Sequence, residues 1–473
     1  MELSQLKHEL AELKRLVFGS RQERHIPAQN PEQMRLDFGG QELIPAIEQP
    51  VTEQITYTRQ KQKHPGRNIL PDHLPVELVT IEPPEDVTGL KKIGEDIVDT
   101  LDYKPASMIL RRYILPKYAA ADGKGVIQGR MPQRTIPKGI AEPGLLAHVL
   151  VQKFVYHMPF YRQIAQFKDL YKAEFPKATL NDWFAACCTL MEPLYVCLRK
   201  KVLASDYLQA DESPIQVQDE QQKGKTHQGY QWVYHAPLLG LVLFEYQKGR
   251  GKNGPKEILK HFRGYLQTDG YEVYDSLAQD QDGITLAGCM AHARRYFFKA
   301  KDSDPARAET ALSYFGQLYE VERHIRQTGL DASQTCSYRQ EHSKTVLETL
   351  FGWAEKEYDH TTPKSPMGKA IYYLLQRKEK LSRYLKDGRL EIDNNLVENS
   401  IRPLALGRKN YLFAGSHDAA QRIAMMYSFF GSCKKQEINP YAWLKTVLER
   451  LPQHSVNRLE ELLPGQWAKV LEV

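Results

Sequence analysis

Cysteine is scarce in this sequence, and it is absent from the first 186 residues. The chain of 473 residues contains six cysteines, with no CxxC pair and no regular spacing between them. This usage argues against a disulfide framework and favours reduced thiols in a cytoplasmic protein. It also argues against zinc in the N-terminal part of the chain, because structural zinc sites take most of their ligands from cysteine and histidine.

Long apolar runs are missing as well. No stretch approaches the roughly 20 apolar residues that a membrane-spanning helix needs. The first residues, MELSQLKHELAELK, are charged and heptad-like, which does not fit a signal peptide. We therefore expect no membrane partner. With 42% hydrophobic and 26% charged residues, the chain can build a real core, and its length suffices for several domains of about 150 residues each.

A strong overall charge is also lacking, since the net charge is only +6. The charge is nevertheless unevenly distributed. Residues 104–138 hold eight basic residues and one acid, and residues 57–67 add four basic residues and no acid. Two basic segments ahead of an acidic site favour a polyanionic substrate, although residues 57–67 alone are more typical of a solvated linker.

What is present begins with a short heptad pattern. Four leucines and a valine recur at spacings of three and four between Leu3 and Val17, which predicts a leucine-zipper-like helix over residues 1–25. Residues 26–75 are rich in proline, glutamine and charge, so we expect a linker there. Residues 76–139 predict a small, basic, β-rich module whose two turns resemble the knuckles of a zinc ribbon without its cysteines.

Residues 140–202 show helical periodicity, interrupted at FPKA. Thr179 with Asp182 resembles a capping box at the start of the last helix, and Lys177 stands at its entry. The pattern is compatible with a helix-turn-helix that binds DNA. Ordinary core helices explain it equally well.

Residues 203–275 predict the order strand, strand, strand, helix, strand. Asp211 lies inside the first strand, and Asp269 follows the last one. A carboxylate within an apolar strand is costly to bury unless it is paired or binds a cation. Two such carboxylates, on strands that can be neighbours, favour a divalent-metal site.

The chain continues with a buried strand (ITLAGCM), a helix (AHARRYFFKA) and a helical region at about 304–387. Cys289 and His292 form a lone CxxH, which offers too few ligands for zinc. The residues themselves do not decide which later acid would join the two aspartates. The candidates are Glu391, Asp393 and Glu398.

Four segments occur in this order along the chain: QADESPIQV, LQTDGYEVYD, GCMAHARRYF and IDNNLVENSIRPLALGRKNYLFAGS. Together they resemble the catalytic core of the large transposase of the insertion sequence sixty-six family. Flanking segments are similar too: ELKRLVFGSRQER to that family's leucine zipper, GRNILPDHLP and KYAAADGKG to its zinc-ribbon region, and INPYAWLKTVLERLP to its C-terminal segment. Two departures stand out. The zinc-ribbon cysteines are absent, and Asn399 follows Glu398 where the family usually has arginine.

The resemblance implies a DDE transposase with an α/β RNase H-like catalytic core over residues 203–430. A mixed sheet flanked by helices, with a helical insertion before the last acid, would precede a C-terminal segment at 431–473. The resemblance gives the catalytic and metal-binding roles to Asp211, Asp269 and Glu398. These acids would hold two Mg²⁺ ions, with Mn²⁺ as a substitute and no zinc; one ion activates water and the other stabilises the leaving 3′ oxygen. The freed 3′ hydroxyl then attacks target DNA.

The implied partners are the terminal repeats of the element and target DNA, in the bacterial cytoplasm. The chain could also act as a homo-oligomer or with small accessory proteins of the same element. Two other functions stay open: a nuclease or resolvase on the same core, and an idle DNA-binding regulator. Weaker candidates for DNA contacts are Arg111, Arg112, Lys177, Arg294, Arg402, Arg408 and Lys409.

Overall fold

The computed structural model describes residue 108 and residues 117–119, 126–128, 134–137, 139–219 and 224–471. Every described residue belongs to the unit Ala106–Val473. The predictions for residues 1–25, 26–75 and most of 76–139 lie outside the described residues, and so do the candidates Arg111 and Arg112.

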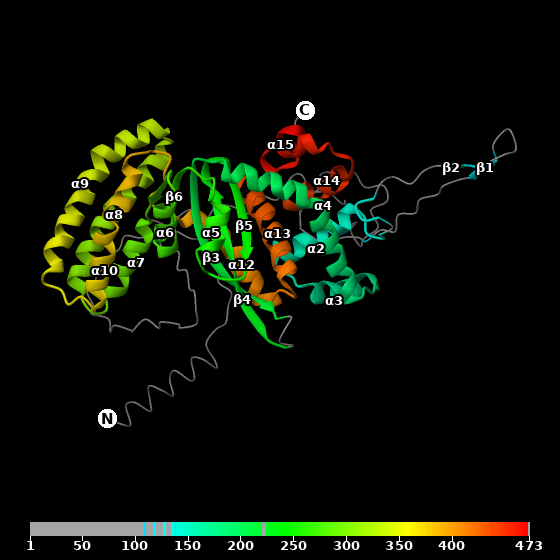
Figure 1. Cartoon of the computed structure of the whole chain (residues 1–473), viewed down its shortest axis with the longest axis horizontal. Helices are drawn as coiled ribbons and strands as arrows, with labels where there is room; N and C mark the ends of the chain where they lie inside the picture. The colour runs from blue at the N-terminus through cyan, green and yellow to red at the C-terminus, as the bar shows by residue number, and fades with distance from the viewer. Residues whose placement is uncertain are drawn as a thin grey trace, which may run out of the picture. The chain divides into compact units, whose positions relative to one another are not determined.

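A mixed sheet of five strands lies at the centre of the described part of the chain (Figure 1). Its spatial order is β5-β4-β3-β6-β7, with β5, β4 and β3 antiparallel and β3, β6 and β7 parallel. The strands are β3 (Tyr207–Gln218), β4 (Thr226–Ala236), β5 (Leu241–Gln247), β6 (Gly264–Gln267) and β7 (Ile284–Ala287).

The predicted order of strand, strand, strand, helix, strand is confirmed. The helix in this series, α5 (Asn253–Ile258), is shorter than the pattern suggested and begins earlier. A mixed sheet flanked by helices is compatible with the predicted RNase H-like core.

Helices from both ends of the described chain share one hydrophobic core with the sheet. The predicted helical segment 140–202 is therefore packed together with the strands that follow it. The longer helices outside residues 305–385 are α2 (Pro143–Phe154), α3 (Phe160–Tyr171), α4 (Lys177–Leu203), α6 (Glu272–Asp280), α7 (Met290–Ala300), α12 (Asn395–Tyr411), α13 (His417–Lys435), α14 (Pro440–Arg450) and α15 (Pro464–Leu471). Short 3-10 turns are η2 (Pro237–Leu239), η4 (Leu451–Gln453) and η5 (Val456–Leu462).

Residues 305–385 are helical, as their periodicity predicted. Together with α7 they form a second hydrophobic cluster, which includes the buried rings of Phe297, Phe315 and Phe351. Figure 1 shows these helices gathered beside the sheet, on the side of β6. They are α8 (Pro305–Thr328), α9 (Ala332–Tyr358), α10 (Pro366–Gln376), α11 (Lys378–Ser382) and the 3-10 turn η3 (Arg383–Leu385).

The capping box predicted at Thr179 and Asp182 is wrong. α4 begins at Lys177, with Pro176 as its N-cap residue and no side-chain hydrogen bond to the first turn. The N–H of Thr179 bonds the carbonyl of Pro176 at 3.0 Å, so this threonine already lies within the helix. Proline fixes φ at a value that suits helix entry, and it lets the helix begin two residues before the expected cap.

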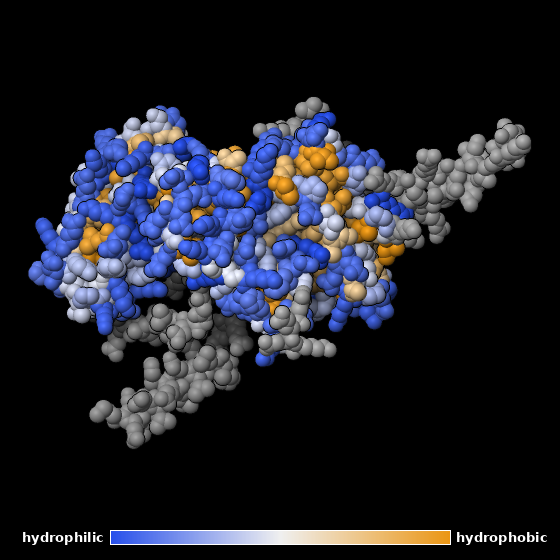
Figure 2. Space-filling model, in the orientation of Figure 1, coloured by the Kyte–Doolittle hydropathy of each residue, from blue (hydrophilic) through white to orange (hydrophobic). Residues whose placement is uncertain are grey.

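Two short strands are described in the predicted β-rich module: β1 (Lys117–Ala119) pairs antiparallel with β2 (Val126–Gln128). The zinc-ribbon resemblance of this module stays a prediction. No helix among the described residues is both long enough and apolar enough to cross a membrane. Most of the described surface seen in Figure 2 is hydrophilic.

Candidate active site

The two predicted aspartates lie at the same level of neighbouring parallel strands. β3 pairs with β6 in a register that places Gln209 opposite Gln267. Asp211 comes two residues later, on the same face of β3 as Gln209, and Asp269 comes two residues after the end of β6, in a bend. The sheet therefore brings both carboxylates to the same edge, where β6 ends.

Two buried glutamines, Gln209 and Gln267, hydrogen-bond the segment 391–397, which contains the acidic candidates Glu391 and Asp393 and leads to Glu398. Gln267 Nε2 donates to the carbonyl of Glu391 at 2.8 Å, and Gln209 Nε2 donates to the carbonyl of Asp393 at 3.0 Å. Gln209 Oε1 accepts from the N–H of Val397 at 3.1 Å. The segment 391–397 is thus held across β3 and β6, directly before the first turn of α12.

Glu398 lies in that first turn and is only 3% exposed. Both of its carboxylate oxygens are buried without a hydrogen-bond partner. The pKa of Glu398 is raised to about 7, mainly by burial and also by Asp393 and Asp269, while Arg295 opposes the rise. A buried carboxylate without hydrogen-bond donors costs free energy to ionise, and a bound cation would offset that free energy.

Asp211 belongs to the same electrostatic environment. Burial raises the pKa of Asp211 well above its ordinary value, and the carboxylates of Glu212, Asp269 and Glu398 raise it further. Asp211 Oδ1 accepts a hydrogen bond from the N–H of Glu212 at 2.7 Å. Asp269 Oδ1 accepts one from the N–H of Tyr271 at 2.9 Å. The carboxylates of Asp269 and Glu398 therefore lie near enough to Asp211 to raise its pKa.

The donor chemistry of this site suits a hard divalent cation, since such ions prefer carboxylate oxygens. The two unpartnered oxygens of Glu398 are available for this role. The side chains do not yet surround an ion, however: across the described residues, no three histidine, cysteine, aspartate or glutamate side chains stand close enough together to hold one.

Two residues of α7 that sequence analysis did not assign to the site lie against Glu398. His292 Nδ1 is 3.6 Å from Glu398 Oε1, and Arg295 Nη2 is 3.7 Å from Glu398 Oε2. Arg295 Nη1 lies 3.3 Å from His292 Nε2, and an arginine can only donate. His292 therefore carries its proton on Nδ1, which lies 3.2 Å from Cys289 Sγ. Burial and the adjacent Arg295 lower the pKa of His292 to about 4, so the ring is neutral.

The other two acidic candidates have structural partners. Asp393 Oδ2 accepts from the hydroxyl of Tyr319 at 2.8 Å, and its Oδ1 accepts from the N–H of Asn395 at 3.0 Å. Asp393 thus fixes the start of α12 against α8. Glu391 contributes its backbone, whose N–H bonds the hydroxyl of Tyr207 at 3.1 Å.

A buried ion pair holds the preceding loop to the helical region. Arg339 on α9 donates to both carboxylate oxygens of Glu322 on α8, at 2.8 and 2.7 Å. It also donates to the carbonyls of Tyr384 and Leu390, at 3.0 and 2.8 Å. The helices of residues 305–385 therefore help to position the segment that leads to Glu398.

Three of the basic residues predicted to contact DNA, Arg402, Arg408 and Lys409, follow Glu398 on α12. Arg402 lies near enough to lower the pKa of Glu398. Arg408 Nη1 donates to Ser213 Oγ at 2.9 Å and to the carbonyl of Pro214 at 2.5 Å. Its guanidinium thus ties α12 to β3.

The remaining basic candidates are dispersed. Lys409 is exposed on α12, and Lys177 is exposed at the first residue of α4. Arg294 is half-buried beside Tyr319 of α8 and opposes the rise of that tyrosine's pKa. Its neighbour Arg295, which sequence analysis passed over, faces Glu398 instead.

Comparison with known protein families places this geometry in context. The family profile described as "Transposase IS66 family" matches residues 138–422. A profile for the IS66 C-terminal element matches residues 428–464, and one described as "Transposase C of IS166 homeodomain" matches residues 5–79.

Similar proteins occur in Sinorhizobium fredii. The uncharacterized protein y4hP is 32% identical over 500 residues, covering 98% of this chain and 89% of the relative. The uncharacterized protein y4jD is 33% identical over 488 residues, covering 98% and 94%. The resemblance inferred from the four segments is confirmed: this chain belongs to the IS66 family of transposases.

Proposed function

We propose that this transposase cuts DNA at the ends of an insertion sequence and joins the freed ends to target DNA by a DDE mechanism. The observation that supports it best is the shared acidic site of Asp211, Asp269 and Glu398. Two of these acids follow one register on neighbouring strands, and the third has buried, unpartnered carboxylate oxygens.

In this proposal the three acids hold magnesium, or manganese in its place, and zinc has no role. Two bound Mg²⁺ ions would supply an activated water and charge stabilisation at the leaving 3′ oxygen. Arg295 and His292 restrain the carboxylate of Glu398 from α7. Arg402, near Glu398 on α12, is suited to contact a phosphate oxygen.

Recognition of the element's ends is assigned in this proposal to the N-terminal part of the chain. Contacts to phosphates carry no sequence information, so an acidic site that acts on phosphates cannot choose a sequence. The excess of basic residues lies between residues 57 and 138. Arginine side chains can read base edges in the major groove, so we expect the double substitution Arg111→Ala, Arg112→Ala to reduce the preference of the full-length protein for terminal over scrambled duplexes in a competition shift at fixed salt.

The chemistry is tested with labelled element-end DNA in the presence of Mg²⁺. Joined strand-transfer product supports a transposase, nicking alone supports a nuclease or resolvase, and a shift without cutting supports a DNA-binding regulator.

Asp211→Ala and Asp269→Ala should each abolish cleavage while the mobility shift persists, because these residues act on the phosphate and do not choose the sequence. Cleavage by either variant at the wild-type rate would remove that residue from the site.

A further inference from the structure

A basic loop leaves the sheet at the end that carries the predicted acids. This basic loop, residues 248–252 (KGRGK), follows β5 and is exposed. β3 and β5 both run antiparallel to β4, and β6 runs parallel to β3. β3, β5 and β6 therefore all run toward the same end of the sheet, which is the end where open α/β sheets bind ligands. β6 ends level with Gln209, and β3 continues beyond that level to Gln218.

Two contacts fix this loop, and each involves a neighbour of a predicted catalytic aspartate. Arg250 Nη2 and Nε lie 2.5 and 2.8 Å from Glu212 Oε1, and Glu212 follows Asp211 in β3. The guanidinium of Arg250 also lies 4.3 Å from the centre of the Tyr271 ring, and the hydroxyl of Tyr271 donates to the Arg250 carbonyl at 3.2 Å. The N–H of Tyr271 in turn bonds Asp269. The position of the basic loop is thus coupled to both aspartates.

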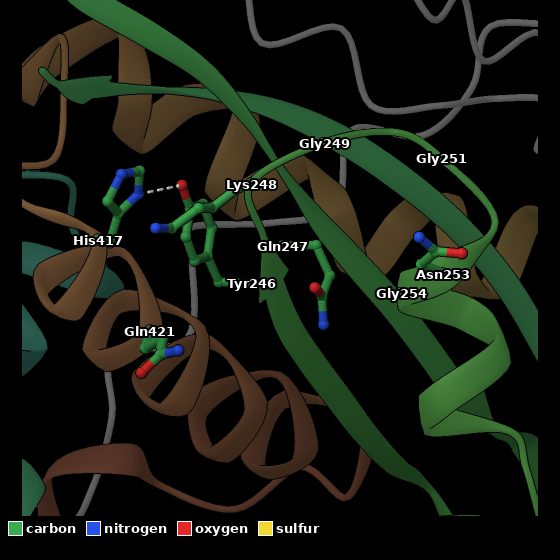
Figure 3. Close-up of a pocket in the computed structure, with 9 residues that line it drawn as sticks. All are labelled: Tyr246, Gln247, Lys248, Gly249, Gly251, Asn253, Gly254, His417 and Gln421. Carbon is green, nitrogen blue, oxygen red and sulfur yellow. Dashed lines mark hydrogen bonds between the residues drawn. The ribbon is translucent and has the colours of Figure 1, made fainter.

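Beside the basic loop lies a hollow of about 520 Å³, formed by the end of β5, the loop and the first turns of α13 (Figure 3). Tyr246 and His417 form one wall, with the hydroxyl 2.8 Å from His417 Nδ1. None of the nine lining residues is an aspartate or a glutamate. The lining residues that offer polar or cationic side chains besides Tyr246 are Gln247, Lys248, Asn253, His417 and Gln421.

We infer that the basic loop and this hollow bind the phosphodiester backbone of the DNA strand that passes through the acidic site. The inference rests on the proposed function and names the surface that holds its substrate. An amine, three amide groups and no acid suit a phosphate. Gly249 and Gly251 have open space where a side chain would begin, so a sugar-phosphate chain can approach the loop closely.

Electrostatics explain why the catalytic site needs such a surface. Asp211, Asp269 and Glu398 form an acidic group that repels phosphate until cations bind. Lys248 lies exposed at the same end of the sheet. Arg250 faces Glu212, and Lys252 Nζ lies 3.8 Å from Asp280 Oδ2, so Lys248 is the cation of the basic loop that we assign to the phosphate. A strand held there would be retained next to the acids without direct contact with them.

A pair of matched charge insertions tests the inference in the full-length protein. Gly251→Asp adds a negative charge within the basic loop, and Gly316→Asp adds the same charge on α8. Both glycines are exposed, and a new Cβ meets no atom within 4 Å at either position, so neither substitution should disturb folding. The affinity for a fluorescent element-end duplex is measured by anisotropy in EDTA, which prevents cleavage. We expect Gly251→Asp to weaken binding about tenfold or more and Gly316→Asp to bind as the wild type does.

A second variant reports the number of phosphate contacts. Lys248→Ala should reduce the slope of log affinity against log salt concentration by about one, the value for one lost phosphate contact. Wild-type affinity in Gly251→Asp together with an unchanged slope in Lys248→Ala would overturn the inference, whether or not the protein cuts DNA. If Gly251→Asp binds more weakly and Lys248→Ala has a smaller slope, but the wild type cuts no DNA, the inference is upheld and the proposed chemistry is overturned.

Discussion

At the scale of single residues, the candidate site depends on groups whose partners come from distant parts of the chain. The carboxylate oxygens of Glu398 accept no hydrogen bond, but His292 and Arg295 of α7 lie within 4 Å of them. Arg295 is the stronger restraint because it is charged and opposes the burial-induced rise of the Glu398 pKa. The acid is therefore held in place by a helix that precedes it by about 100 residues.

Arg295→Ala should lower the cleavage rate about tenfold, equal to ~1.4 kcal/mol in the barrier, while the affinity for DNA in EDTA stays unchanged. Loss of the guanidinium removes the restraint on Glu398 and not a DNA contact. Arg295→Lys keeps the charge and should recover part of the rate. The measurement is single-turnover cleavage of element-end DNA, and a lysine variant no faster than the alanine variant would count against this role.

His235 gives a pH dependence that is independent of the site. It is 2% exposed, neither ring nitrogen has a hydrogen-bond partner, and burial lowers its pKa to about 3. The unfolded chain takes up a proton near pH 6.5 and the folded chain does not, so stability falls as the pH drops below about 6.5. Between pH 6.5 and 5.5 this loss amounts to about 1 kcal/mol.

His235→Leu should remove this part of the acid sensitivity. We expect urea unfolding of the wild type to lose about 1 kcal/mol more than the variant between pH 6.5 and 5.5. Equal losses in the two proteins would show that His235 is protonated in the folded state or titrates normally there.

At the scale of elements, α13 covers the free edge of the sheet. β5 is an edge strand, and the N–H groups of an edge strand lack a neighbouring strand. Ser428 Oγ accepts from the N–H of Phe244 at 2.8 Å, and Ser432 Oγ accepts from the N–H of Val242 at 2.9 Å. Two serines one helical turn apart thus satisfy two buried N–H groups.

Ser428→Ala should lower the free energy of unfolding by about 1–3 kcal/mol, the cost of a buried donor without a partner. Ser313→Ala, at an exposed position on α8, is the matched control and should change it by less than about 0.5 kcal/mol. Chemical denaturation of both variants provides the comparison. A loss for Ser428→Ala no larger than that of the control would mean that the N–H of Phe244 finds another acceptor.

At the scale of the whole molecule, the helices before the sheet belong to the same packed body as the sheet. Leu194, Leu198 and Val202 of α4 are fully buried in the core that contains β5 and α13. The hydroxyl of Tyr195 donates to the carbonyl of Phe244 at 2.6 Å. A role of α3 and α4 in binding DNA stays a prediction. Along most of its length, α4 contributes side chains to the hydrophobic core.

A fragment of residues 1–202 should therefore fail to fold as a compact monomer. The cut falls before Leu203, the last residue of α4, and it removes the strands and helices that cover the buried face of that helix. We expect aggregation in size-exclusion chromatography and no cooperative unfolding of the helical signal. A monomeric fragment with a sharp transition would show that the N-terminal helices form a core of their own.

The sequence predicted the strands and the proximity of Asp211 and Asp269, because apolar alternation and strand order are local properties. It left Glu391, Asp393 and Glu398 as equal alternatives, and only the family resemblance selected Glu398. The helix α7 was predicted, but its contact with Glu398 was not; the CxxH at Cys289 and His292 was the signal for that contact, and it was interpreted only as a zinc motif. Arg294 was predicted to contact DNA and Arg295 was not predicted to lie at the site, because spacing alone does not tell which face of α7 meets α12.

The sequence by itself determined the class of the protein, the order of its strands and the residues that resemble the family's acids. These follow from periodicity and from ordered motifs, which need no knowledge of distant contacts. Only the tertiary structure decided that the Glu398 carboxylate is buried without a hydrogen-bond donor and that His292 and Arg295 lie against it. The same holds for the position of the basic loop at the end of the sheet where the acids lie. Each of these depends on packing between segments far apart in the chain, where burial and charge act through space and leave no local pattern.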